Sequence, residues 1–98
     1  MFDIEDMKVV FKEAAPTTPE VVDYVKSMCY AFAKAGMLIY VWDGQYATTK
    51  TVFVPNQRQV AEVVFQLRDE GFKVKVDKLI NQHTGQRYLV VSGWDEDE

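Results

Sequence analysis

The sequence predicts one small α+β domain, with two helices covering one face of a four- or five-stranded sheet. Three observations lead to this fold class. The chain has 98 residues, which is too short for two ordinary cores. Two segments carry apolar residues at helical spacing, and each ends at a glycine. Short β-rich segments surround them, giving the order β-α-β-β-α-β-β over residues 1–94.

The first half begins with a predicted strand and continues into a helix. Met7–Lys12 is short, rich in β-formers and followed by Pro16, so it predicts a strand. Thr18 is the expected N-cap of a helix over residues 19–35, with Pro19 in its first turn. The expected buried stripe of this helix contains Val21, Val22, Val25, Met28, Cys29 and Phe32.

A strand pair is expected next. Residues 37–42 are all apolar, which is typical of a strand covered on both faces or facing a partner. The dipeptide Asp43-Gly44 is a strong turn signal. The return strand is expected within residues 45–54, and best at 49–54, where threonines suit a hydrated face.

The second half predicts another helix and a hairpin. Asn56 is the expected N-cap, Gln59 occupies the position of a capping-box partner, and Gly71 ends the helix. Phe72–Asp77 alternates between apolar and polar residues, as a half-buried strand does. Arg87–Ser92 is the expected last strand, beyond a polar loop.

Two topologies fit this order. In one, βαββαβ is a ferredoxin-like core that the last strand extends. In the other, a unit of helix, glycine and hairpin is used twice. We favour the ferredoxin-like arrangement, because Met7–Lys12 supplies the first strand that it requires.

The charge is unevenly distributed along the chain. The formal net charge is −4, yet residues 14–94 carry two more bases than acids. The acids are concentrated before residue 14 and in the tail 95–98, which is expected to be disordered. No apolar run reaches the length of a membrane span, and the N-terminus does not resemble a signal peptide. A cytoplasmic protein is the expectation.

No residue pattern indicates catalysis. His83 is the only histidine, and it falls in a polar loop without an evident partner for general-base chemistry. Cys29 is the only cysteine and lies in the apolar stripe of a helix, so it is expected to be buried and reduced. Neither a metal-ligand spacing nor a phosphate-binding glycine motif occurs. We therefore expect neither an enzyme nor a cofactor.

Aromatic side chains suggest a protein interface. Residues 37–42 place two apolar sets on opposite faces of a strand, and the helices can cover only one of them. Tyrosine and tryptophan are favoured anchors in interfaces. We expect a homodimer or another protein partner at Tyr40, Trp42, Tyr46 and Phe65, although a second core layer could also cover these residues.

Two other functions remain open. The second hairpin carries Lys73, Lys75, Lys78 and Arg87 against a single acid, so it is a candidate nucleic-acid contact. The alternative is that these residues are only the solvent face of an edge strand. A regulatory domain that binds a small ligand at a subunit interface is the third possibility.

The last third of the chain is similar in style to small accessory proteins of tailed phages. The similarity lies in the segment Arg68-Asp-Glu-Gly-Phe-Lys-Val-Lys-Val76 and in Leu89-Val-Val-Ser-Gly-Trp94. It implies a non-enzymatic accessory or inhibitor protein, and it assigns no functional residue. The expected function is a binding or regulatory role exerted through protein–protein contacts.

Overall fold

The computed structural model describes residues 3–49 and 52–95. Within these ranges the protein is α+β, with three helices and five strands. In chain order the elements are α1 (Ile4–Ala14), α2 (Thr18–Lys34), β1 (Tyr40–Trp42), β2 (Tyr46–Ala47), β3 (Val52–Phe53), α3 (Gln57–Asp69), β4 (Lys73–Ile80) and β5 (Arg87–Ser92).

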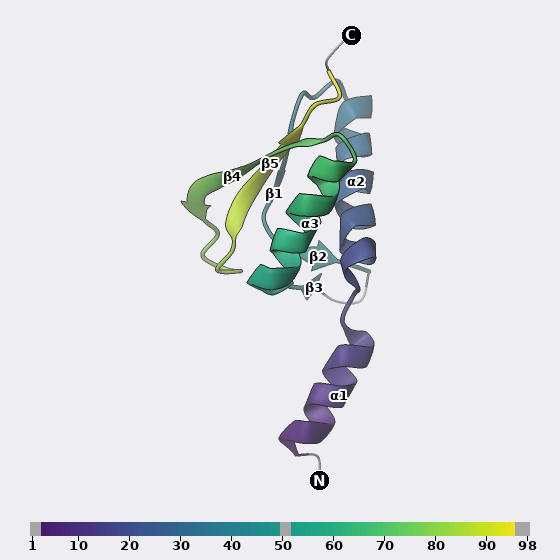
Figure 1. Cartoon of the computed structure of the whole chain (residues 1–98), viewed down its shortest axis with the longest axis vertical. Coiled ribbons are helices and arrows are strands. Elements are labelled where there is room, and N and C mark those ends of the chain that lie inside the picture. Colours follow the sequence, from purple (N-terminus) through teal and green to yellow (C-terminus); the bar gives the residue numbers. More distant parts are fainter. Residues whose placement is uncertain (1–2, 50–51, 96–98) are drawn as a thin grey trace.

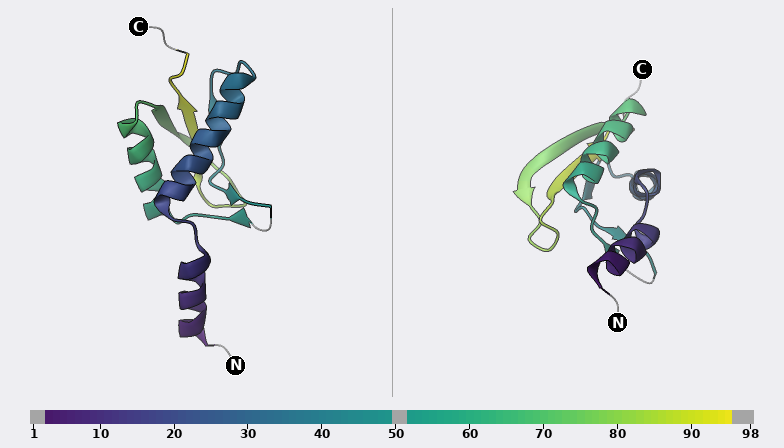
Figure 2. Two further views of the ribbon diagram at one scale, coloured as in Figure 1. Left: turned by 90° about the vertical axis from the view of Figure 1, so that its right-hand side faces the viewer. Right: turned by 60° about the horizontal axis from the view of Figure 1, so that its bottom comes forward.

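The body of the molecule has two layers. Strands β1, β5 and β4 form an antiparallel sheet in that order, and α2 and α3 lie across one face of it (Figures 1 and 2). Two helices share one face of the sheet, as predicted, but within the described residues this sheet has three strands and not the expected four or five. Helix α1 projects from the base of this body, which makes the molecule elongated, with extents of 58 × 25 × 23 Å.

The core lies between the helices and the sheet. Across the sheet, Tyr40 is paired with Val91 and Val91 with Val74, so three buried side chains form one row. Trp42 and Leu89 begin a second row. The helices complete the core with Val21, Val22, Val25, Cys29, Val63, Val64 and Leu67.

Polar contacts join the two core helices at two positions. The Thr18 hydroxyl donates to the Glu62 carboxylate at 2.8 Å, and the Lys26 ammonium bonds the Glu70 carboxylate at 2.6 Å. The N-cap of α2 is Thr17, one residue before the predicted Thr18. Thr17 and Glu20 form a reciprocal capping box, which leaves the Thr18 side chain available to reach α3.

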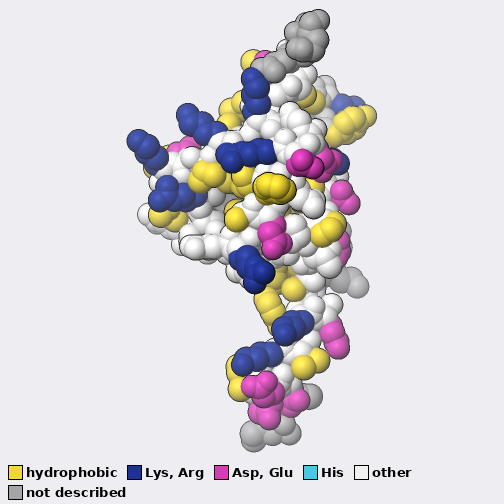
Figure 3. All heavy atoms as spheres, in the orientation of Figure 1, with side chains coloured by type: hydrophobic (Ala, Val, Ile, Leu, Met, Phe, Trp, Pro, Cys, Tyr) yellow, Lys and Arg dark blue, Asp and Glu magenta, His cyan; other side chains and the backbone are white. Residues whose placement is uncertain are grey.

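The predicted strand at Met7–Lys12 is wrong, because these residues belong to α1. Hydrophobic side chains are exposed along this helix, and none of its residues is buried (Figure 3). The observed order therefore starts with two helices, and the first strand that a ferredoxin-like core needs is absent from the described residues.

The predicted pairing of residues 37–42 with 45–54 is also wrong. Only Tyr40–Trp42 forms a strand, and it pairs with β5. The following segment makes a separate ribbon of two short strands, β2 and β3, which pair with each other. Residues 50 and 51 of the predicted return strand lie outside the described residues. The first copy of a duplicated helix–hairpin unit is thus not formed.

The turn after β1 explains this change of partner. The Trp42 indole N–H donates to the Gln45 carbonyl at 2.9 Å, and the Asp43 carboxylate accepts from the Gln45 N–H at 3.0 Å. The Thr84 hydroxyl bonds the Asp43 carbonyl at 3.1 Å. These bonds fasten the turn to the loop of the second hairpin rather than to a return strand.

The second hairpin is confirmed, and its first strand is longer than predicted. Strand β4 continues to Ile80, with an irregularity in the register between Val76 and Ile80. Asn81 is buried in the loop, where its side-chain oxygen accepts from the N–H groups of His83 and Thr84. Beyond β5, the predicted acidic tail lies outside the described residues except for Asp95.

Candidate protein-binding surfaces

The expected interface residues do not share one surface. Trp42 is 0 % exposed and Tyr40 is also buried, so the expectation that they form an exposed patch is wrong. Tyr46 is half-buried, with its ring centroid 5.1 Å from that of Tyr24. Phe65 is 74 % exposed on the outer side of α3. Of the four residues, only Phe65 offers a large apolar surface to a partner.

The residues that alternate with Tyr40 and Trp42 are exposed, and so is Leu38, which precedes the strand. Ile39 and Val41 point away from the helices, and each is more than two-fifths exposed. The indole of Trp42 explains why this side of the strand faces the core. Its ring fills the core, and its N–H is hydrogen-bonded within the chain.

Helix α1 carries the most exposed apolar surface for its length. Ile4, Met7, Val10, Phe11 and Ala14 recur at spacings of three and four, so they lie along one side of the helix. We call these five residues the α1 stripe. Each of them is exposed. A helix of 11 residues with no buried side chain gains no stability from core packing.

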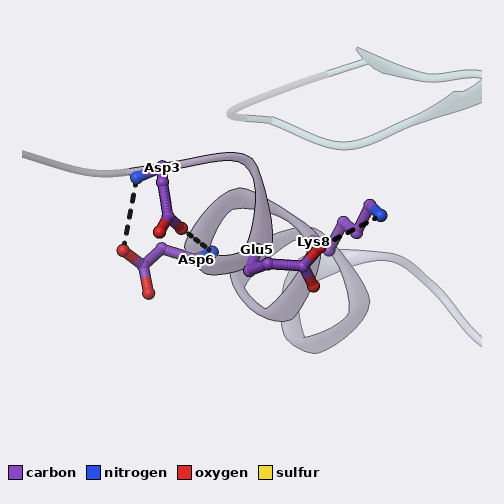
Figure 4. Close-up of polar contacts among 4 residues, drawn as sticks. All are labelled: Asp3, Glu5, Asp6 and Lys8. Atoms are coloured by element: carbon purple, nitrogen blue, oxygen red, sulfur yellow. Dashed lines mark hydrogen bonds and ion pairs between the residues drawn. The ribbon is translucent and has the colours of Figure 1, made fainter.

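Local interactions account for the helical form of α1. The Asp3 carboxylate accepts from the Asp6 N–H at 3.0 Å, and the Asp6 carboxylate accepts from the Asp3 N–H at 3.3 Å (Figure 4). This reciprocal capping box satisfies two donors at the helix start. An ion pair of 3.4 Å joins Lys8 to Glu5 one turn later.

The connection to α2 holds α1 away from the body. Pro16 is buried, and its carbonyl accepts from the Gln59 side-chain amide at 2.9 Å. The ring centroids of Phe11 and Phe53 are 5.4 Å apart. The last turn of α1 thus contacts β3, and the linker that follows it is bonded to α3, whereas the first two turns of α1 extend freely (Figure 1).

A groove runs between α3 and the second hairpin. It has a volume of about 730 Å³. Its apolar lining consists of Val60, Ala61, Val64, Phe65, Val76, Ile80 and Leu89. We call it the α3–β4 groove. Phe65, Val76 and Ile80 each expose more than two-fifths of their surface there.

The charged residues in the groove all have one sign. Arg68 and Arg87 line it, and no described acid does. The Arg68 guanidinium bonds the Val74 carbonyl at 2.7 Å, so its position is fixed at the start of β4. Hydrophobic side chains are visible over α3 and β4 together with Lys and Arg, and over α3 also with Asp or Glu (Figure 3). The groove is therefore apolar with a positive border.

The basic residues of the second hairpin are all exposed, but they are spread out. Lys73 and Lys75 lie on the face of the sheet that no helix covers, and Lys75 is paired with Val90. Lys78 lies past the irregular part of β4, and Arg87 borders the α3–β4 groove. This uncovered face combines ammonium groups with the apolar side chains of Val41 and Val90.

The two residues considered for catalysis, His83 and Cys29, differ in their exposure. His83 is exposed in the hairpin loop. Burial raises the pKa of the Cys29 thiol to about 11, which opposes formation of a nucleophilic thiolate. No group of three or more His, Cys, Asp or Glu side chains within 3–49 and 52–95 could hold a metal.

The α1 stripe was not predicted, because the short β-rich pattern of Met7–Lys12 predicts a strand. The signal was present in the residues that flank this segment. Asp3 and Asp6 have the spacing of a capping box, and Ile4 and Ala14 extend the spacing of three and four on both sides. A window that starts at residue 3 favours a helix.

None of the helices in the described ranges has both the length and the apolar character that crossing a membrane requires. Comparison with protein-family models, curated proteins and solved structures finds no match to this chain.

Proposed function

We propose that this protein is a small non-enzymatic binding protein that acts through protein–protein contacts made by helix α1. The observation that carries this proposal is the α1 stripe, a continuous apolar surface on a helix that projects from the body. Large exposed apolar surfaces are rare on isolated soluble proteins and typically mark interaction sites. An accessory or inhibitor role, as in the small phage proteins that the sequence resembles, fits such a helix.

The spacing of the stripe suits one mode of recognition. Amphipathic helices that bind grooves use anchors three, four and seven residues apart. Ile4, Met7 and Phe11 have this spacing, and Ala14 continues it. Methionine adds a flexible side chain that adapts to irregular surfaces.

A matched pair of substitutions tests the proposal. Met7→Glu places a carboxylate in the stripe, whereas Val9→Glu places one on the opposite side of α1. Both residues are exposed by similar fractions, 57 % and 56 %, so neither change disturbs the core. The immobilised parent protein and the Val9→Glu variant should retain the same partner from a cell extract of the source, identified by mass spectrometry. Met7→Glu should lose it.

Equal retention by all three proteins would contradict the proposed use of α1. The absence of retention by any of them would also contradict it, unless the parent protein forms a dimer that depends on Met7. Nuclease treatment of the retained material separates a direct protein partner from one bridged by RNA or DNA.

The basic residues of the second hairpin support nucleic acid as a second candidate partner. Lys73, Lys75, Lys78 and Arg87 are exposed, and Asp77 is the only acid within β4 and β5. Phosphate contacts by such residues give binding that weakens steeply with salt.

Fluorescence anisotropy with a labelled single-stranded oligonucleotide tests this candidate. Binding at low salt should be lost in a Lys73→Glu/Lys75→Glu variant and retained by Met7→Glu. An oligonucleotide that stays unbound at 20 mM salt, a condition chosen to favour phosphate contacts, would eliminate this candidate.

A further inference from the structure

We infer that the partner of helix α1 is a second copy of this chain, whose α3–β4 groove receives the α1 stripe. This inference rests on the proposed binding function of α1 and names its occupant. Both surfaces are exposed and apolar, although the stripe contacts its own chain at Phe11, whose ring centroid lies 5.4 Å from that of Phe53. They also differ in charge, shape and position in ways that make them complementary.

Charge provides the first argument. Helix α1 and its cap carry four acids and two bases. Asp6 and Glu13 lie along one border of the stripe, next to Val10, whereas Lys8 and Lys12 lie along the other. The groove presents Arg68 and Arg87 and no described acid. The acidic border of α1 therefore matches the positive border of the groove.

Shape provides the second argument. The stripe is one helix face about 16 Å long, since each residue of a helix adds about 1.5 Å. The groove is lined along α3 from Gln57 to Arg68, which also corresponds to about 16 Å of helix. Phe65 and Ile80, both exposed, would form its outer walls, and the small Ala61 leaves space between them for a helix to approach.

Position provides the third argument. A chain cannot place α1 in its own groove, because only three residues, Ala15 to Thr17, separate α1 from α2. Pro16 in this linker is buried and bonded to Gln59. Helix α1 points along the long axis, away from its own body (Figures 1 and 2). A second chain related by a two-fold axis and running in the opposite direction would have its body beside this helix.

Such an arrangement exchanges two identical contacts. Each chain donates α1 and receives the α1 of its partner, so the interface is self-complementary and closed. The exchange buries two stripes and two grooves at once. Doubling the contact brings a small helix–groove interface closer to the area typical of stable dimers.

Sedimentation equilibrium on the full chain and three variants tests the inference. The parent protein and Val9→Glu should dimerise at micromolar concentration. Met7→Glu, in the stripe, and Phe65→Glu, in the groove, should each raise the dissociation constant at least about 30-fold, as a buried anchor residue does. Circular dichroism confirms that each variant keeps its fold, because Met7 and Phe65 are exposed in the single chain.

A mixture of the two defective variants gives the sharpest result. Met7→Glu retains an intact groove, and Phe65→Glu retains an intact stripe. Mixed in equal amounts, they should form a heterodimer that neither forms alone, held by one of the two contacts. High salt should weaken this dimer, since opposite charges border its contact.

Three outcomes would overturn the inference: a monomeric parent at one millimolar, a parent dimer insensitive to Phe65→Glu, or no complementation in the mixture. If the chain is monomeric while capture from extract still depends on Met7, the occupant is a different protein and the proposed function stands. If neither experiment depends on Met7, both proposals fail.

Discussion

A single side chain, that of Trp42, determines which face of β1 packs into the core. Its indole fills the space between the sheet and the helices, and its N–H is satisfied by the Gln45 carbonyl at 2.9 Å. Tyr40 follows it inward by the two-residue period of a strand. Ile39 and Val41 are consequently left on the outer face.

Replacement of Trp42 should therefore reduce stability rather than assembly. Trp42→Ala should lower the free energy of unfolding by about 3–5 kcal/mol, because it leaves a large cavity. Trp42→Phe retains an aromatic ring but leaves the Gln45 carbonyl unbonded, so it should cost about 1–2 kcal/mol. Urea denaturation followed by circular dichroism measures both. A loss below 1 kcal/mol for Trp42→Ala would show that the side chain does not fill the core.

Gly44 offers a second prediction at the residue scale. Its φ of +89° is unfavourable for other residues, and an added Cβ would lie 2.8 Å from Cβ of Gln86. Gly36 has a similar φ of +80°, but no atom lies within 4 Å of the Cβ position. Gly36→Ala should cost about 1 kcal/mol from backbone strain alone. Gly44→Ala should lower the stability clearly more than Gly36→Ala in the same thermal melts. An equal loss of stability in the two variants would contradict the close approach between Gly44 and Gln86.

Cys29 and Tyr40 predict how stability depends on alkaline pH. Burial raises the pKa of the Cys29 thiol to about 11 and raises that of the Tyr40 hydroxyl as well. In the unfolded chain both groups ionise at a lower pH than in the folded chain. The contribution of these two groups to the free energy of unfolding should thus be fully present below about pH 9 and should decrease as the pH rises from about 9 to about 11.

Cys29→Ala should reduce this alkaline slope, and the folded parent should react slowly with thiol reagents at pH 8. Rapid labelling under native conditions would show that the thiol is accessible.

At the level of elements, the capping boxes of α1 and α2 have different consequences. Thr17 caps a helix whose apolar face is in the core, whereas Asp3 caps a helix with no buried residue. Thr17→Ala should lower the global free energy of unfolding by about 1 kcal/mol. Asp3→Ala should leave it unchanged and accelerate amide hydrogen exchange only within α1. Both variants should be measured at protein concentrations low enough for the chain to be monomeric. A decrease in the global free energy of unfolding for Asp3→Ala would contradict the separation of α1 from the core.

The same contrast explains which elements could be predicted from the sequence. Helices α2 and α3 and the hairpin β4–β5 have long, clear periodicities, which burial on one face imposes. The segment Met7–Lys12 is too short to distinguish a strand from a helix by its own pattern, and its β-branched residues favoured the wrong choice. The partner of β1 was not predicted, because pairing between residues 47 to 51 positions apart depends on the packing of Trp42 and on the Thr84 contact.

The candidate site was predicted only in part for the same reason. Phe65 was identified because it lies off the buried stripe of its helix, a local property of the sequence. The groove beside it depends on the course of the long strand β4, which local patterns do not specify. The α1 stripe was not predicted, because the helix that carries it was not predicted.

At the level of the whole molecule, the projecting helix α1 makes the protein longer than a compact chain of the same size. A compact chain of 98 residues has a radius of gyration of about 13 Å. The observed radius is 15.0 Å, and the excess arises from the projecting helix. The buried Pro16, its bond to Gln59 and the contact of Phe11 with Phe53 hold this geometry without a partner.

The Met7→Glu variant allows this geometry to be measured in an isolated chain. Small-angle scattering at low concentration should give an elongated monomer, with a radius of gyration near 15.0 Å before the contribution of hydration. Gln59→Ala in the same background should broaden the distance distribution, because the linker loses its bond to α3. A compact profile near 13 Å would instead mean that α1 folds back onto its own body. The helix would then not be displayed to a partner, and the reciprocal exchange would lose its structural basis.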